Sequence, residues 1–436
     1  MSLLLIYTPL TTPRLKYAFD LVFKEVLGID YSITHSLHEF GFSILPKFNY
    51  SEEKVADELF FYASKLLFEK GIHRQDISVF DWENTKAFFA THPKYIFPFD
   101  PFAASFYLVT RYEEYLPHQR DIYDRFDAVQ SLAYEKGFLQ KPLVNIWAKK
   151  IKKVLSDKFP QLKFPHRTYQ YISTIDIDNA YAYKEKGLMR TGGALLRSLS
   201  KLDVKAITDR TSVLLGYKKD PYDTYDTLNV IQQKYNLTCI YFFLLGDYGE
   251  NDKNVSISRK KFQSLIKSIA DYSDVGIHPS FGSNTNPEKL RKEISRLRKV
   301  LKRDVTKSRQ HFLMMHFPVT YRRLLDHDIT DDYTMGYSGD VGFRAGICTA
   351  FYFYDLEFEA STKLKVHPFA VMDATLKYYM KVKPEEAIRF ITPLVKEVKE
   401  VDGTFISLWH NESLSNMHPW EGWKDVYEQV VKIAAQ

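Results

Sequence analysis

The spacing of hydrophobic and polar residues changes near residue 169, and this change divides the chain into two parts. In the first part, the spacing predicts one short strand and three helices, at Leu3–Tyr7, Glu53–Lys70, Pro98–Tyr115 and Lys141–Asp157. The segment Lys158–Arg167 contains Pro160 and Pro165, so we expect it to be a linker.

In the second part, short runs rich in β-branched and aromatic residues alternate with amphipathic stretches. Strands are predicted at Tyr171–Ile175, Thr238–Leu245, Val275–His278, Gln310–Met314, Lys363–His367 and Thr404–Trp409. Helices are predicted at Tyr222–Tyr235, Arg259–Tyr272, Pro287–Arg303, Tyr321–Asp326, Met372–Met380, Pro384–Glu400 and Glu421–Ile433. This alternation predicts an α/β fold with a parallel sheet, open or closed into a barrel, whose chemistry lies at the carboxyl ends of the strands.

The chain has 436 residues, which is too long for one ordinary core, so we expect two domains, at residues 1–165 and 166–436. Charged residues make up 26% of the chain and hydrophobic residues 45%, as in globular proteins. The net charge of +6 is a weak indication of an acidic substrate and is too small to indicate nucleic-acid binding. The many aromatic residues, 30 Tyr and 32 Phe, suit stacking on sugar rings as well as they suit an aromatic core.

Cysteine content and hydropathy exclude further classes. The chain has only two cysteines, Cys239 and Cys348, which cannot form a disulfide framework or a cysteine-based zinc site. The amino terminus lacks a basic region and a cleavage site, and no stretch approaches the ~18 apolar residues of a membrane span. We therefore predict a cytoplasmic protein without a membrane partner; the oligomeric state is left open.

The clearest candidate for chemistry follows the strand at Tyr171–Ile175. Asp176 and Asp178 are two residues apart, so their side chains point to the same face of an extended chain. Two carboxylates at a strand end can bind a hard cation, or one can hold a metal while the other acts as a base. The alternative is an Asx turn that closes the strand.

Other predicted strand ends also carry reactive side chains. His278 ends one strand, Arg309 and His311 lie on one face of another, and His410 follows the last. A single histidine is usually a satisfied core residue. Three histidines at strand ends, in the part that carries the aspartate pair, predict a shared site.

The order and spacing of these residues resemble the polysaccharide deacetylases of carbohydrate esterase family four, the NodB-homology domain. The resemblance extends from about Tyr169 to Gln436. It implies a distorted (β/α) barrel with fewer than eight full units. In that family the first aspartate of the pair is the catalytic base and the second is a metal ligand, which correspond to Asp176 and Asp178. Leu408-Trp409-His410 matches the motif of the general acid, and Arg309 matches the arginine that contacts the base.

The chain departs from the family at the His-x-x-x-His metal motif. Gly282 stands four residues after His278, where the family has its second histidine. The best replacement is His311, on the neighbouring strand end, and His316 is a poorer one. The first 165 residues resemble an uncharacterised domain that precedes deacetylase-like domains in some bacterial proteins; this likeness gives fold context and no activity.

From these residues we predict a metal-dependent deacetylase. Asp178, His278 and His311 would hold a divalent metal, with zinc favoured and cobalt or nickel as alternatives. Asp176 would take a proton from water while Arg309 keeps it ionised, and His410 would protonate the leaving group. The predicted substrate is an N-acetylated or O-acetylated sugar or glycan precursor.

Two loop regions are predicted to shape the pocket. Tyr337 and Arg344 lie in glycine-rich loops suited to a sugar groove, and Trp409 stands next to His410. Alternatively, Arg344 pairs with Asp340 and Trp409 packs in the core. Two other functions stay open: a non-catalytic deacetylase-like protein that binds a glycan or a partner protein, and a hydrolase of a different amide.

Overall fold

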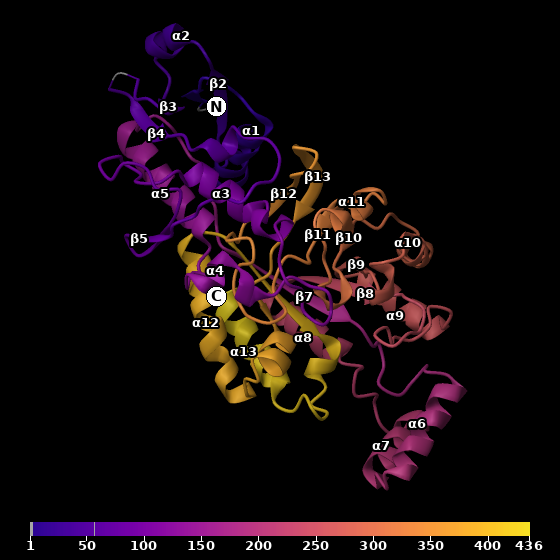
Figure 1. The fold of residues 1–436 in the computed structure, drawn as a ribbon. Helices are drawn as coiled ribbons and strands as arrows, with labels where there is room; N and C mark the ends of the chain where they lie inside the picture. Colours follow the sequence, from indigo (N-terminus) through magenta and orange to yellow (C-terminus); the bar gives the residue numbers. More distant parts are fainter. Residues whose placement is uncertain (1–2, 56) are drawn as a thin grey trace.

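The computed structural model describes residues 3–55 and 57–436, which form two sheets and the helices that cover them (Figure 1). The first sheet is parallel, with the order β2-β1-β3-β4. Its strands are β1 (Leu3–Tyr7), β2 (Asp30–Thr34), β3 (Lys47–Ser51) and β4 (Leu59–Tyr62). A small antiparallel pair, β5 (Phe80–Trp82) and β6 (Thr85–Ala87), follows in the chain.

The second sheet has nine strands in the order β12-β13-β11-β10-β9-β8-β7-β15-β14 and does not close on itself. Its strands are β7 (Gln170–Ile177), β8 (Thr238–Leu244), β9 (Asp274–His278), β10 (Lys307–Ser308), β11 (Asp331–Asp332), β12 (Phe351–Asp355), β13 (Ala360–Val366), β14 (Val371–Met372) and β15 (Thr404–His410). All neighbours pair in parallel except β12 and β13.

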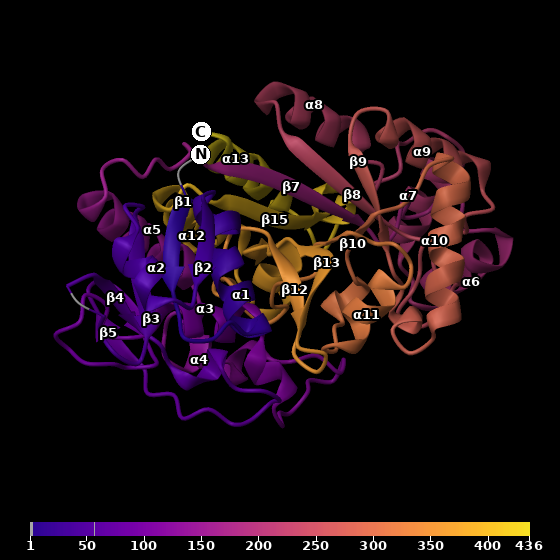
Figure 2. The same ribbon diagram turned by 90° about the horizontal axis from the view of Figure 1, so that it is seen from above.

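Helices pack around both sheets. The first part contains α1 (Pro13–Phe19), which continues as a π-helix (Asp20–Leu27), then α2 (Leu37–Phe42), α3 (Pro101–Val109), α4 (Leu132–Glu135) and α5 (Leu143–Lys158). The second part contains α6 (Leu188–Ser200), α7 (Val204–Leu214), α8 (Tyr225–Tyr235), α9 (Lys260–Ala270), α10 (Pro287–Leu301), α11 (Val319–Leu325), α12 (Pro384–Glu400) and α13 (Trp423–Ala435). Figure 2 shows α8, α9 and α10 on the outer side of the strands β7, β8 and β9. Among the described residues, no helix combines the length and apolarity that crossing a membrane requires.

The central strands are covered on both faces, which explains why apolar residues follow one another along them. In β8, every residue after Thr238 is buried, and the run Cys239–Leu244 is continuously apolar. A parallel strand between two covering layers needs apolar side chains on both faces. The register then aligns the strand ends, because His410 pairs with Asp176, and Leu244 pairs with His278.

The structure confirms the predicted α/β class, and the open sheet is compatible with a distorted barrel of fewer than eight full units. The helix predicted over Glu53–Lys70 is wrong, because the described part of this range contains β4 and a short 3-10 turn at Lys65–Leu67. The strand predicted over Gln310–Met314 is also wrong, because β10 ends at Ser308 and a 3-10 turn follows. The pattern also missed other elements, among them β2, β3, α1, β12, α6 and α7.

The two parts of the chain share a continuous apolar core that extends from Leu4 to Ala434. Polar contacts add to it: the Tyr17 hydroxyl donates to the Tyr352 carbonyl at 2.6 Å, and Asn145 donates to Thr349 Oγ1 at 2.7 Å. The first part therefore packs directly on the open edge of the second sheet, near β12 and β13.

Candidate functional site

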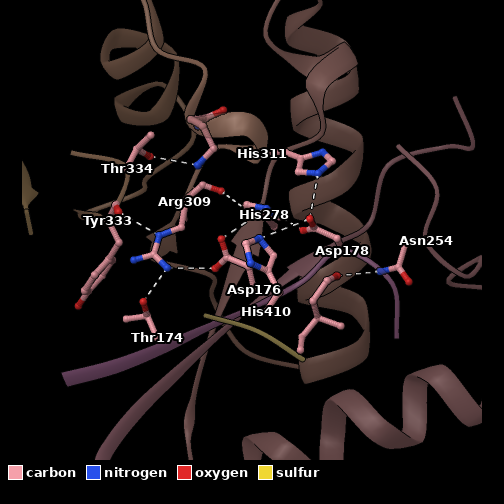
Figure 3. Close-up of polar contacts among 12 residues, drawn as sticks. Thr174, Asp176, Asp178, Asn254, His278, Arg309, His311, Tyr333, Thr334 and His410 are labelled. Carbon is pink, nitrogen blue, oxygen red and sulfur yellow. Dashed lines mark hydrogen bonds and ion pairs between the residues drawn. The ribbon is translucent and has the colours of Figure 1, made fainter. Parts of the chain in front are cut away.

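The predicted catalytic and metal-binding residues lie together at the carboxyl ends of β7, β9, β10 and β15 (Figure 3). Asp178 is central. Its Oδ1 lies 3.1 Å from His278 Nε2, and its Oδ2 lies 3.3 Å from His311 Nε2 and 3.6 Å from His410 Nε2. The structure thus brings together residues that are far apart in the chain, such as Asp178 and His410.

Hydrogen bonds to the second ring nitrogen orient two of these histidines. His278 Nδ1 lies 2.5 Å from the Arg309 carbonyl, and His311 Nδ1 lies 2.9 Å from Asp252 Oδ1. Both partners accept hydrogen bonds, so each Nδ1 carries a hydrogen and each Nε2 faces Asp178. In the neutral form of either ring, Nε2 presents a lone pair. Metal-binding histidines are oriented by partners of this kind.

This arrangement leaves two acceptors facing each other. Asp178 Oδ1 is buried and makes no hydrogen bond with any part of the chain that the structure describes, although His278 Nε2 is 3.1 Å away. A cation between the two atoms would satisfy both. Asp178, His278 and His311 each offer one ligand atom, and these atoms lie within 4.8 Å of one another. Two imidazole nitrogens and one carboxylate oxygen form a donor set that fits zinc and similar metals.

Asp176 is fixed beside this cluster by Arg309. The Arg309 Nη1 atom donates to Asp176 Oδ1 at 3.0 Å and to Thr174 Oγ1 at 2.6 Å, while Nε donates to the Tyr333 carbonyl at 3.0 Å. Both side chains of the ion pair are buried, with exposures of 0% and 2%. The other carboxylate oxygen of Asp176 lies 3.7 Å from His278 Nε2, so it faces the metal-binding cluster.

His410 is oriented by Asp373, directly after β14. His410 Nδ1 lies 2.8 Å from Asp373 Oδ1, and the His410 backbone amide donates to Asp373 Oδ2 at 2.8 Å. Asp373 is fully buried. The Nε2 atom of His410 therefore points toward Asp178 and the pocket, in a position from which it can donate a proton.

Attraction between the carboxylates and the histidines shifts the pKa values in the cluster. Burial raises the pKa of Asp178, but His311, His278 and His410 outweigh it and hold that pKa well below the usual value. Burial lowers the pKa of His311, but Asp178 and Asp252 outweigh it and raise the pKa to about 9. Burial and the nearby Asp178 raise the pKa of Glu412 to about 7.

A cavity of about 470 Å³ opens over the cluster, a volume typical of small-ligand sites. Its walls are mainly aromatic and apolar, whereas its floor carries the carboxylates and histidines described above. The aromatic wall residues are Tyr123, Phe312, Tyr378, Tyr379 and Trp420. Ile122, Tyr123 and Arg125 come from the first part of the chain, so both parts line the cavity.

The three residues predicted to bind substrate lie elsewhere. Trp409 is fully buried and packs against Tyr427, because alternation along β15 directs Leu408 and His410 to the pocket and Trp409 to the opposite face. Tyr337 and Arg344 are also buried. Arg344 pairs with Glu114 and not with the predicted partner Asp340. The Glu114 carboxylate accepts two hydrogen bonds from Arg344, at 2.9 and 2.6 Å.

The glycine-rich loop around Arg344 does not form a sugar groove. A Cβ atom on Gly342 would lie 2.5 Å from the Leu139 carbonyl oxygen, and one on Gly346 would lie 2.7 Å from Leu108 Cδ1. Both glycines also have positive φ angles, of 138° and 62°. They are required for close packing between the two parts of the chain.

Sequence reasoning missed Asp252 and Asp373, which orient His311 and His410. Asp373 follows the apolar run Phe369–Met372, which ends in the short strand β14, whereas Asp252 lies in the loop after β8 and no local pattern marks it. It also missed Arg125. Arg125 pairs with Asp121 and also lines the cavity. No local pattern marks that second role.

Comparisons with known proteins cover the two parts separately. Residues 4–160 match the model of a family of unknown function, DUF7033. No curated protein matches the chain.

Several solved structures are similar to about 60% of the chain. One is a provisionally assigned polysaccharide deacetylase from Mycobacterium smegmatis, with 13% identity, a TM-score of 0.40, and coverage of 63% of this chain and 86% of that one. A polysaccharide deacetylase from Bacillus cereus has 10% identity, a TM-score of 0.30 and coverage of 62% and 86%. A CE4 family pseudoenzyme from Bacillus anthracis has 12% identity, a TM-score of 0.29 and coverage of 61% and 63%. At these identities and TM-scores, the matches establish no function for this chain.

Proposed function

We propose that the protein is a metal-dependent hydrolase that removes acetyl groups from an N-acetylated or O-acetylated sugar or glycan precursor. The observation that carries this proposal is the pair of acceptors, Asp178 Oδ1 and His278 Nε2, that face each other across 3.1 Å beside His311. A proton donor and a proton acceptor flank this pair, as hydrolysis of an amide or ester requires.

A divalent ion held by Asp178, His278 and His311 would polarise an acetyl carbonyl and make a bound water more acidic. Zinc is the favoured ion, and cobalt or nickel are alternatives. Asp176 is the base that takes the proton from the attacking water. Arg309 fixes the direction of the free oxygen of Asp176, because it donates a hydrogen bond to the other carboxylate oxygen.

His410 is the general acid. It donates its Nε2 proton to the leaving nitrogen or oxygen when the bond to the acetyl group breaks. Asp373 holds the other nitrogen and stabilises the positive ring before transfer. The products are acetate and a free amino or hydroxyl group on the sugar.

The cavity walls support a carbohydrate substrate. Tyr123, Tyr378, Tyr379 and Trp420 offer flat apolar faces around a polar floor. Sugar rings present apolar C–H faces and polar edges, which such a combination can bind. An acetyl group directed to the floor would reach the cluster while the ring contacts the walls.

The first test is metal content in the purified protein and in Asp178→Ala, His278→Ala and His311→Ala. We expect about one zinc, cobalt or nickel ion per wild-type chain, as in three-ligand catalytic sites, and its loss in each variant. His316→Ala is the matched control, because His316 is a nearby histidine that contacts Asp124 and lies outside the cluster. Wild-type protein that binds no metal after reconstitution would contradict the proposal.

The second test is acetate release from a panel of N-acetylated and O-acetylated sugars. Asp176→Asn should abolish release and keep the metal, because the residue acts on the proton and not as a ligand. Sugar binding without acetate release in the wild type would instead support the non-catalytic alternative. Release from non-acetyl amides alone would identify a different amide hydrolase.

A further inference from the structure

Helices α6 and α7 form a hairpin that extends away from the rest of the molecule (Figure 1). No residue of α6 is buried, and α7 buries only Val213. The base of the hairpin is closed by Asp220, whose carboxylate accepts hydrogen bonds from the amides of Ala182, Tyr183 and Lys184 at 2.8, 2.9 and 2.9 Å. The hairpin is therefore a structured projection that adds little to the core.

The two faces of α6 differ in character. A helix has 3.6 residues per turn, so residues three or four positions apart share a face. On this spacing, one side of α6 is apolar and the opposite side is basic. The apolar side carries Leu188, Met189, Leu195, Leu196 and Leu199. The basic side carries Arg190, Arg197 and the C-cap residue Lys201. Leu188 and Met189 are each 93% exposed and Leu196 is 69% exposed, which is unusual for an apolar face in water.

The hairpin also concentrates positive charge. Residues 188–219 contain seven Lys and Arg residues and two acidic residues, so their net charge of +5 accounts for most of the +6 of the whole chain. Arg197, Lys201 and Lys205 form no ion pair within the described part of the chain. Their charges are free to meet an anionic partner.

The hairpin begins next to the candidate active site. It follows β7, which delivers Asp176, and Arg190 ties its first turn to the site. Arg190 donates to the carbonyls of Asn254 and Lys253 at 3.0 and 2.6 Å, and Asn254 donates to the Ile177 carbonyl at 3.0 Å. The hairpin is therefore anchored at its base to the strand that carries Asp176.

We propose that the α6–α7 hairpin binds the surface of an anionic phospholipid bilayer. The apolar side of α6 enters the boundary between headgroups and acyl chains, and Arg197, Lys201 and Lys205 contact lipid phosphates. Charge and apolarity together select this partner. Nucleic acid would leave the leucines in water, and a second copy of the chain would bring two positive surfaces together. This inference revises the expectation of no membrane partner, and it does not depend on the proposed enzymatic activity.

The test is co-sedimentation of the full chain with vesicles of phosphatidylcholine, with or without phosphatidylglycerol. We expect binding only when phosphatidylglycerol is present, and release when salt is raised. Arg197→Gln combined with Lys201→Gln should weaken the partition by more than about tenfold, because each cation near an anionic surface contributes appreciably. Leu196→Ser combined with Leu199→Ser should weaken it at least as much.

The matched control is Phe42→Ser combined with Ile44→Ser, which removes side chains that are 79% and 96% exposed on the first part of the chain. This variant should bind vesicles like the wild type. Failure of the wild type to bind phosphatidylglycerol vesicles would overturn the proposal. So would a dimer, detected by light scattering, that the leucine variant abolishes. Metal content measured on the same samples separates either failure from failure of the proposed hydrolase.

Discussion

His410 lies between carboxylates on both sides of its ring. Burial lowers its pKa, but Asp373, Asp178 and Asp176 outweigh burial and raise that pKa well above the usual value. His410 therefore keeps its proton at neutral pH, as a general acid must. The same shift makes its contribution to stability largest at low pH, and this contribution is lost as the pH rises through the raised pKa.

Asp373→Asn should move the alkaline limb of kcat/KM to lower pH. The substitution removes the largest attraction that holds the proton on His410, so the ring loses its proton at a lower pH. The measurement is a pH profile with an acetylated sugar that the wild type hydrolyses. A lower rate with an unchanged limb would mean that Asp373 only positions the ring.

Asp252→Asn should weaken metal binding without removing any ligand. The Asp252 carboxylate fixes His311 Nδ1 at 2.9 Å, and loss of such a partner typically costs 10–100-fold in metal affinity. Competition with a chelator measures the change. Asp247→Asn is the control, since Asp247 is an exposed carboxylate on the same loop that pairs with Lys292 and Arg296. Equal affinities for both variants would contradict the assigned role.

At the scale of elements, a short loop of the first part acts as a wall of the cavity. Arg120 and Phe126 form an isolated bridge, and Asp121 Oδ1 accepts from the amides of Tyr123 and Arg125 at 2.9 Å each. The Arg125 guanidinium then donates to the Phe312 carbonyl at 2.8 Å and to the Tyr379 hydroxyl at 3.0 Å. The loop is thereby fixed to the second part next to His311.

Arg125→Gln should raise KM and leave kcat and metal content nearly unchanged. The substitution loosens a wall that contacts substrate away from the reacting bond, so it removes binding common to the ground state and the transition state. Steady-state kinetics separate the two constants. Arg120→Gln serves as control, because Arg120 pairs with Asp124 on the outer side of the same loop. A fall in kcat alone would assign Arg125 to the chemistry.

Local patterns predicted the elements that deliver the site and failed where tertiary contacts decide the backbone. The strands β7, β8, β9 and β15 coincide with runs rich in β-branched and aromatic residues, so their positions were predicted well. The segment after Ser308 bends because Phe312 and Leu313 adopt positive φ angles of 59° and 53°, which no propensity favours. The helix α6 was missed because it contains Gly192-Gly193, a pair that lowers helix propensity.

At the scale of the whole molecule, a buried ion pair joins the two parts of the chain. Glu114 pairs with both Arg344 and Arg111, and all three side chains are at most 3% exposed. Burial raises the pKa of Glu114, but the two arginines outweigh it and hold that pKa below the usual value. Its contribution to stability is therefore present at neutral pH and is lost as the pH falls through the lowered pKa.

Glu114→Gln should destabilise the protein by about 3–5 kcal/mol, because it leaves a buried positive charge without its partner. Urea unfolding at neutral pH measures the change. Glu397→Gln is the control, because Glu397 forms a more exposed ion pair with Lys141 across the same boundary and should cost no more than about 1 kcal/mol. Similar costs for the two variants would show that burial does not set the strength of these pairs.

The Glu114–Arg344 pair also bears on how such chains are inherited. A recombinant that joins the first part of one relative to the second part of another would place Arg344 opposite whatever residue replaced Glu114. An exchange that brought a non-acidic residue opposite Arg344 would bury an unpaired charge, and selection would remove it. We therefore expect these two positions to change together across lineages, and the two parts of the chain to descend as one unit rather than as exchangeable modules.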